Sequence, residues 1–263
     1  MWHFELNVRI SDMGLRQIIK GIDGSQQNIG YSAVVPEGLQ FINFFGGDVG
    51  QGRNLADGGL PARVIGEPVV GSMSQGVLCT SHESYIKTGV PQSAKMTVMG
   101  VFCPTSDSRA YAISNASATR PIGFSVYSEP SATAGVQNLR IQMGGKQSSD
   151  GANAVATAAI AAAIKNNVPM AFAGTVDYSN LDETKVVIMH LKGGAKNNVT
   201  TSFTQAGSGL PGLLIGSEMD AVTYAGARVL AMAVWNRVLT DDEITAQYQQ
   251  IQRYYLGVHG LDI

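Results

Sequence analysis

Hydrophobic and polar positions change period within the first part of the chain. Residues 2–10 alternate apolar and polar side chains, and a period of two predicts a half-buried β-strand. Ser11 and Asp12 then offer helix caps, and apolar residues recur at helical spacing at Leu15, Ile18, Ile19 and Ile22. Residues 1–33 are therefore predicted to form an arm of one strand and one short amphipathic helix. This arm packs either on a partner chain or on the rest of its own chain, and the pattern leaves both open.

From residue 34 onward, short apolar runs are broken by Gly, Pro, Asn and Asp at close intervals. The strands predicted from these runs are residues 39–45, 64–65, 77–79, 84–86, 95–102, 110–114, 122–127, 137–143, 169–176, 185–191, 200–204 and 212–215. Many short strands without long helices between them favour a β-sandwich or a β-barrel.

The alanine-rich residues 153–165 are ambiguous. Alanine has the highest helix propensity of all residues, yet this stretch lies between two predicted strands and has no strong helix cap before it. It is predicted to be either a short helix or an irregular strand.

The C-terminal part carries the strongest pattern. Residues 227–235 form a long apolar run with a single charge, Arg228, which indicates a central strand covered on both faces. After a turn, Thr240 and Glu243 have the spacing of a helix capping box. One face of the predicted helix carries Ile244, Gln247, Tyr248 and Ile251 at 3.6-residue spacing, and the helix is expected to finish before Gly257.

This order of strand, turn, core strand and capped helix resembles the concanavalin A-like lectin/glucanase superfamily. More narrowly, it looks like the laminin-G-like modules of bacteriophage and secreted bacterial proteins. The matching residues are Ile215, Gly216, Tyr224, Gly226, Val229, Ala233, Trp235, Asn236, Arg237, Leu239, Thr240, Glu243, Ile244 and Tyr248. The resemblance implies an all-β, antiparallel jelly-roll β-sandwich over residues 34–263 with a C-terminal capping helix. The motif bears on the fold and says nothing about a site.

Composition narrows the classes of partner. Charged residues make up 14% of the chain and the net charge is −2, so no basic surface favours nucleic acid or anionic lipid. No apolar run is long enough to predict membrane insertion, and the N-terminus lacks a signal-peptide pattern. Cys79 and Cys103 each lie in an apolar run, which favours buried thiols, although pairing between them stays open.

The sequence predicts no catalytic residues. Hydrolases of the resembled fold carry two glutamates a few residues apart on one strand, and no such pair occurs here. Glu83 beside His82 is the nearest approach to an acid and base pair. The four histidines show no metal-ligand spacing, so a protein without enzyme activity and without a cofactor is expected.

A sugar site needs an exposed aromatic ring and polar groups for the hydroxyls. Tyr178, flanked by Asp177 and followed by Asn180, is the best candidate, and Tyr85 and Tyr111 also lie near predicted strand ends. Packing within the fold is the alternative role for each tyrosine. Because the resembled modules often bind calcium at one rim, weak calcium candidates are Asp48, Asn54, Asp57 and Asp220, although none matches the family pattern residue by residue.

The resemblance, the low charge, the missing signal peptide and the unmatched arm together suggest a non-catalytic bacteriophage virion protein. Such a protein would be a tail-fibre, tail-associated or capsid-decoration component and would form a homo-oligomer or bind other virion proteins. Its lectin-like domain would bind either a cell-surface glycan or neighbouring subunits. It would be made in the host cytoplasm and be extracellular after release. The alternatives are a polysaccharide-degrading glycoside hydrolase or depolymerase, a secreted bacterial carbohydrate-binding module and a purely structural module.

Overall fold

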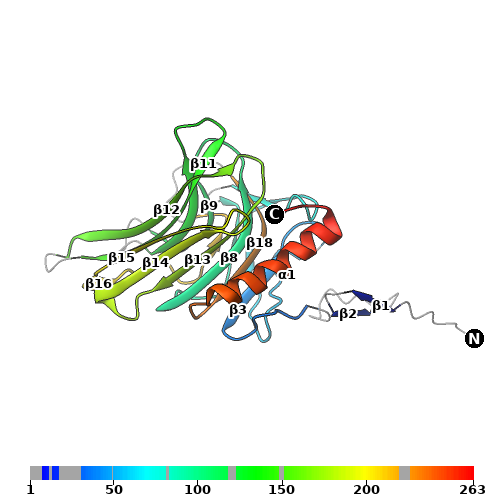
Figure 1. The fold of residues 1–263 in the computed structure, drawn as a ribbon, viewed down its shortest axis with the longest axis horizontal. Helices are drawn as coiled ribbons and strands as arrows, with labels where there is room; N and C mark the ends of the chain where they lie inside the picture. The colour runs from blue at the N-terminus through cyan, green and yellow to red at the C-terminus, as the bar shows by residue number, and fades with distance from the viewer. Residues whose placement is uncertain are drawn as a thin grey trace, which may run out of the picture.

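The computed structural model describes residues 8–11, 14–17, 31–48, 50–80, 83–117, 123–147, 151–218 and 226–263. In these ranges, two antiparallel sheets of eight strands each pack face to face, and one long helix lies across the outside of one of them (Figure 1). The predicted all-β sandwich with a single C-terminal helix is confirmed.

The sheet under the helix is here called the helix-side sheet. Its strand order is β15-β14-β13-β8-β18-β6-β5, with β3 also paired to β18. The strands are β3 (Leu39–Phe44), β5 (Val69–Val70), β6 (Val77–Cys79), β8 (Lys95–Pro104), β13 (Met170–Asp177), β14 (Thr184–His190), β15 (Ala195–Thr201) and β18 (Ala227–Trp235).

The opposite sheet is here called the far sheet. Its strand order is β12-β11-β10-β9-β17-β7-β4, with β16 also paired to β11. The strands are β4 (Arg63–Ile65), β7 (Tyr85–Lys87), β9 (Ala110–Ser114), β10 (Phe124–Pro130), β11 (Val136–Lys146), β12 (Asn153–Lys165), β16 (Gln205–Ala206) and β17 (Leu214–Ile215).

The neighbours of strand β18 explain why its sequence is apolar apart from Arg228. It pairs with β8 on one side and with β3 and β6 on the other. Facing the core between the sheets are Val229, Met232 and Val234. Facing the helix are Leu230, Ala233 and Trp235. Because both faces are covered, every position after the half-buried Arg228 carries an apolar side chain, and the predicted central strand is confirmed.

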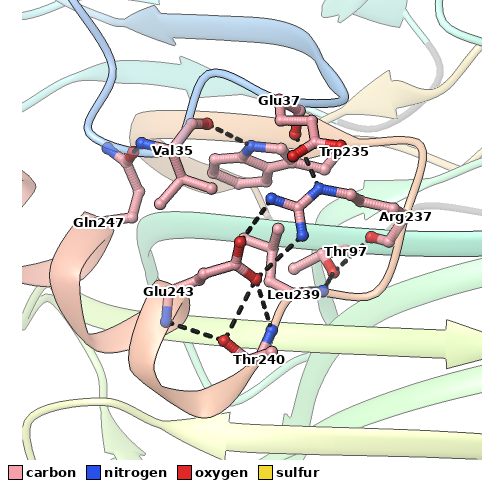
Figure 2. Close-up of polar contacts among 9 residues, drawn as sticks. All are labelled: Val35, Glu37, Thr97, Trp235, Arg237, Leu239, Thr240, Glu243 and Gln247. Carbon is pink, nitrogen blue, oxygen red and sulfur yellow. Dashed lines mark hydrogen bonds and ion pairs between the residues drawn. The ribbon is translucent and has the colours of Figure 1, made fainter.

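Helix α1 (Asp241–His259) begins with the predicted capping box. The Thr240 side chain accepts a hydrogen bond from the Glu243 backbone N–H at 3.2 Å, and the Glu243 carboxylate accepts one from the Thr240 N–H at 2.8 Å (Figure 2). The predicted end before Gly257 is wrong, because the helix continues to His259. A glycine inside a helix costs only about 1 kcal/mol, whereas Gly260 adopts the left-handed conformation that ends a helix.

Among the described residues, no helix combines the length and the apolar character needed to cross a membrane.

The carboxylate of Glu243 makes the stability of this helix junction depend on pH. Two hydrogen bonds from the Arg237 guanidinium, at 2.9 and 2.7 Å, and that from Thr240 N–H lower its pKa from 4.5 to about 2. A lowered folded-state pKa stabilises the fold above the unfolded-state value, and this contribution is lost as the pH falls toward 2.

We expect Glu243→Gln to be less stable than the native chain at neutral pH and the difference to close between about pH 5 and about pH 2. Urea unfolding along that pH range measures it. Asp242→Asn, which removes a neighbouring carboxylate without touching the capping box, is the control. A difference that stays constant with pH would contradict the role given to the ion pair.

The alanine-rich stretch forms strand β12, so the irregular-strand alternative is the right one. β12 pairs antiparallel with β11 almost throughout, and the register shifts near Gln137. Close to the shift, Ala162 has a φ of 49°, and its N–H donates to the Asn138 side chain at 3.0 Å. Pairing with β11 and burial of Ala156 and Ala158 against the core outweigh the helix propensity of alanine.

The predicted helix of the arm is wrong over Gly14–Gln17. These residues form strand β2, which pairs antiparallel with β1 (Val8–Ser11), and Ile10 lies opposite Leu15. A short apolar run fits a helical or a strand period, and pairing decides between them. The other residues of the predicted helix lie outside the described ranges, and the boundary between residues 33 and 34 stays a prediction.

The segment that follows the arm is fixed to helix α1. The N–H of Val34 donates to the Gln250 side chain at 3.2 Å, and that of Val35 to the fully buried Gln247 at 3.4 Å. The Gln250 side chain donates to the carbonyl of Ser32 at 2.7 Å. The chain therefore enters the sandwich along the helix.

Both cysteines are free and buried, as the apolar runs predict. Cys79 and Cys103 lie opposite consecutive residues of β18 but in the strands on its two sides. Burial raises the pKa of Cys79 to about 12 and that of Cys103 to about 11, so both are protonated thiols at neutral pH.

Candidate functional site

The structure divides the predicted sugar-binding residues between two places. Asp177, Tyr178 and Asn180 follow one another at the end of β13, on the rim of the sandwich. Tyr85 and Tyr111 lie on the far sheet, where they are only 7% and 4% exposed. Neither of these two rings is available to stack on a sugar in this conformation.

Asp177 is held at the rim by its neighbours. Its carboxylate accepts hydrogen bonds from the N–H and the hydroxyl of Ser179, at 3.0 and 2.6 Å, and lies 3.5 Å from the ammonium of Lys95. Partial burial raises the pKa of Asp177, but these hydrogen bonds and the Lys95 charge outweigh it, so the net pKa is lowered. The rim therefore presents an ionised carboxylate in a fixed orientation.

Tyr178, the residue after Asp177, packs against the core of the sandwich. Its ring is half-buried against the core, and its hydroxyl accepts a hydrogen bond from Gln92 at 3.2 Å. Gln92 also donates to the carbonyl of Gly207 and accepts from the side chain of Asn115 at 2.9 Å. Four loops thus meet around one tyrosine, which gives the rim a rigid base.

Asn180 completes the rim site. Its side-chain oxygen accepts from the Asp182 N–H at 3.1 Å and caps the short 3₁₀ helix Leu181–Glu183. The residue is exposed, and within the described ranges its amide nitrogen donates no hydrogen bond. The rim site is here defined as Asp177, Tyr178 and Asn180, and it offers a charged acceptor, a half-buried ring and an amide donor.

The structure describes three of the four calcium candidates, and all three lie between β3 and β4. Asn54 is buried, and its side-chain oxygen accepts from the N–H groups of Ile42 and Ala56 at 3.1 and 3.0 Å. That oxygen therefore organises a loop. Asp48 and Asp57 are exposed, and Asp220 lies outside the described residues. No group of three or more His, Cys, Asp or Glu side chains gathers in the described part of the chain, and calcium binding by these candidates stays a prediction.

A second polar group, which the sequence reasoning missed, lies on the outward face of the far sheet. Val126 and Ile141 pair with each other and face the core, so their neighbours along β10 and β11 point outward. Tyr127 is paired with Arg140 there. The arginine face is here defined as Arg109, Tyr127, Glu129 and Arg140.

The arginine face is tightly interconnected. The Arg109 guanidinium lies 5.0 Å from the centre of the Tyr127 ring. Glu129 bridges the two cations, at 3.5 Å from Arg109 and 2.5 Å from Arg140. Burial raises the pKa of Tyr127 although both arginines oppose it, so the phenol stays neutral and donates to Gln142 at 3.1 Å. The outward alternation along β10 and β11 is the sequence signal that points to this group.

The cluster where β18 joins α1 is the most connected polar group near the helix, but its bonds are internal. Arg237 donates to the carbonyl of Glu37 and to Glu243, and Thr97 bonds the backbone on both sides of the turn (Figure 2). We assign this cluster to the fold.

Solved structures with a similar fold are receptor-binding domains of botulinum neurotoxins. That of the C/D mosaic serotype has a TM-score of 0.57 at 11% identity, covering 83% of this chain and 53% of that one. The serotype D ligand-binding domain in complex with N-acetylneuraminic acid has a TM-score of 0.57 at 10% identity, covering 83% and 52%. A structure of the serotype D binding domain has a TM-score of 0.55 at 10% identity, and the match covers 83% of this chain and 52% of that one.

No protein-family model and no curated protein matches this chain. It spans about half the length of the neurotoxin domains. At such low identity the likeness shows the fold alone, and that fold is a two-sheet antiparallel jelly-roll sandwich. The narrower laminin-G-like assignment and the bacteriophage setting stay predictions.

Proposed function

We propose that this chain is a non-catalytic carbohydrate-binding protein and that the rim site binds the sugar. The observation that carries the proposal is the ionised Asp177 carboxylate, fixed by Ser179 and Lys95 beside Tyr178 on the rim of a lectin-like sandwich. A fixed carboxylate accepts hydrogen bonds from sugar hydroxyls without a further ordering cost. The serotype D neurotoxin ligand-binding domain, of which this chain matches 52%, is in complex with N-acetylneuraminic acid, and this supports sugar binding as the function.

A glycan array followed by titration of the best ligand tests the rim site. We expect Asp177→Ala to weaken binding about tenfold, because it removes a charged hydrogen-bond acceptor. Asp182→Ala, which removes an exposed carboxylate from the same loop, is expected to bind like the native chain. Equal binding by the native chain and Asp177→Ala would contradict the proposal, and so would an array without any bound glycan.

We further infer that the protein works as a virion component, in a tail fibre, a tail or a capsid decoration, and assembles through its N-terminal arm. Support comes from the β1–β2 pair, which belongs to neither sheet of the sandwich. An isolated two-stranded hairpin is marginally stable in water, and contact with other chains would stabilise it. In this setting the protein reaches the cell surface when the host lyses.

Comparing the full chain with residues 31–263 tests the assembly role. Residues 31–35 bond to α1 and stay in the shortened chain, so the sandwich is expected to fold. Light scattering should then give one chain per particle for the shortened chain and two or more for the full chain. The same number of chains per particle for both would contradict assembly through the arm.

The alternative function is catalysis, and it can be tested with the same protein sample. Glu83 is described by the structure, but its neighbour His82 lies outside the described residues. Release of reducing ends from a bound polysaccharide would favour a glycoside hydrolase or depolymerase over the binding function. We propose that no reducing ends are released.

A further inference from the structure

We propose that the protein has a second sugar site, a pocket that takes the acetamido group of an N-acetylated sugar. The pocket, here called the end pocket, is lined by residues of β12, β13 and β14 and by Asp262 and Ile263. It lies at Met170, the first residue of β13, whereas the rim site lies at Asp177, the last. At about 3.3 Å per residue, roughly 23 Å separates these two positions. The second site rests on the proposed carbohydrate-binding function, but it shares no residue with the rim.

The end pocket is an opening into the space between the two sheets. On β14, Val186 and Ile188 face the core, and the alternation of a strand places His190 on the same inward face. Met170 and Ile164, one from each sheet, are 5% and 1% exposed, and both line the pocket. Its volume is about 190 Å³. Because a cavity of about 150 Å³ accommodates a benzene ring, the end pocket has room for an acetamido group and part of a sugar ring.

One wall of the end pocket is the C-terminal segment, and this wall is fixed to the sandwich. The Tyr248 hydroxyl donates to the carbonyl of Ile263 at 2.6 Å, and the Ile263 side chain is buried. The ammonium group of Lys192 binds the carboxylate of Asp262 at 2.7 Å and its carbonyl at 3.1 Å. The wall is therefore in place before a ligand arrives, and binding needs no further ordering of this segment.

The end pocket has an apolar bottom and a polar mouth. Its buried side chains, Ile164, Met170 and Ile263, are all apolar. Its exposed residues include Lys165 and Asp262, which carry charge. A ligand with a small apolar group at one end and hydroxyl groups at the other matches this division. Sugar hydroxyls both donate and accept, so they can bond the ammonium and the carboxylate at the mouth.

His190 supplies a directional donor in the end pocket. The N–H of Gly193 donates to its Nδ1 at 2.9 Å. A neutral ring that accepts at Nδ1 carries its proton on Nε2. Burial lowers the pKa of His190, and the charge of Lys192 lowers it further, so the ring is neutral at neutral pH. The ring therefore offers an Nε2–H to a carbonyl oxygen of a ligand.

An acetamido group fits these walls better than a carboxylate does. Its carbonyl oxygen accepts from the His190 Nε2–H, and its methyl group contacts the apolar bottom beside Met170 and Ile164. A carboxylate could also accept from His190, but it would bring a negative charge against buried apolar side chains. The pocket chemistry therefore favours a neutral N-acetylated sugar.

Titration of the full chain with N-acetyl-D-glucosamine and with D-glucose tests the end pocket, since the two sugars differ only at C2. NMR signals of the Met170 methyl group and the His190 ring report binding at this place. We expect N-acetylglucosamine to bind there about tenfold more tightly, because it buries a methyl group and gains a hydrogen bond. N-methylacetamide is the third probe and lacks the sugar ring. Equal binding of the two sugars, unchanged Met170 and His190 signals, or N-methylacetamide binding as tight as that of N-acetylglucosamine would overturn the proposal.

Substitutions in the end pocket locate the preference. His190→Phe keeps a ring but removes the Nε2–H, and Ala163→Leu keeps the histidine but fills space at the half-buried lining residue Ala163. Each is expected to remove most of the preference for N-acetylglucosamine, read at Met170. Circular dichroism checks folding, and the two variants allow the test to proceed if one does not fold. Lys185→Gln, an exposed position of β14 outside the pocket, is the control and should keep the preference. A preference that survives both pocket substitutions would overturn the assignment.

A rim variant separates this site from the rim site. Asp177→Ala should leave the N-acetylglucosamine shifts at Met170 and His190 unchanged, because it lies at the other end of β13. Loss of these shifts in Asp177→Ala would overturn the end pocket as a separate site. If Asp177→Ala kept full glycan binding while the His190→Phe variant lost it, the rim proposal alone would fail. The reverse result would overturn the end pocket alone.

Discussion

Replacing Trp235 by alanine is expected to lower the free energy of unfolding by about 3–5 kcal/mol. Trp235 ends strand β18, is fully buried and packs under helix α1. Alanine would leave a large cavity between the sheet and the helix. It would also remove the indole N–H that donates to the carbonyl of Val35 at 2.9 Å, in the segment that enters the sandwich (Figure 2).

Urea unfolding of the two chains measures this loss. Trp235→Phe is the matched control, because it keeps most of the apolar volume but removes the indole N–H. Its expected cost is smaller, about 1–3 kcal/mol. If Trp235→Ala lowered the free energy of unfolding by less than about 1 kcal/mol, the packing of Trp235 between β18 and helix α1 would not stabilise the fold as proposed.

The sequence predicts best the parts of the fold whose structure is determined by residues close together along the chain. The β18 run is apolar on both faces, and the Thr240 and Glu243 capping box needs only a spacing of three positions. The end of the helix was harder to predict. Glycine commonly ends a helix, but α1 continues past Gly257 and its C-cap is Gly260. Glycine lowers helix stability only slightly at position 257, and burial of the neighbouring helix residue Tyr255 against the sheet outweighs this cost.

Elements whose structure depends on a distant partner were predicted less well. Residues 153–165 have the composition of a helix and become a strand because β11 pairs along them. Leu15 fits a helical spacing with Ile18, and it lies opposite Ile10 in a strand pair instead. In both cases the pairing partner, which a local pattern does not contain, decides the structure.

The candidate site also has a part that local sequence predicts and a part that depends on distant residues. Asp177, Tyr178 and Asn180 are nearly consecutive, so their grouping at a strand end is visible in the sequence. Gln92 and Asn115, which fix Tyr178, come from loops far along the chain and are joined only by folding.

Strand ends also mislead about exposure. Tyr85 and Tyr111 have the residue type and the position expected of a sugar-binding ring, yet they are buried. The position of a residue along a strand gives the face it points to, but it does not give what covers that face.

Replacing Thr97 by valine is expected to cost about 1–3 kcal/mol, although the two side chains have nearly the same shape. Thr97 lies on β8 and is fully buried. Its hydroxyl donates to the carbonyl of Arg237 at 2.8 Å and accepts from the N–H of Leu239 at 2.9 Å (Figure 2). One hydroxyl therefore satisfies both sides of the turn between β18 and α1, and valine would leave two backbone groups without their partner.

Thr97→Ser separates the hydroxyl from the methyl group. Serine keeps both hydrogen bonds and loses one methyl group, which costs about 1 kcal/mol on burial. The expected order of stability is therefore threonine, then serine, then valine, measured by urea unfolding at neutral pH. If valine proved as stable as threonine, the turn would be held by the Arg237 and Glu243 ion pair and by packing alone, and the hydroxyl of Thr97 would have no structural role.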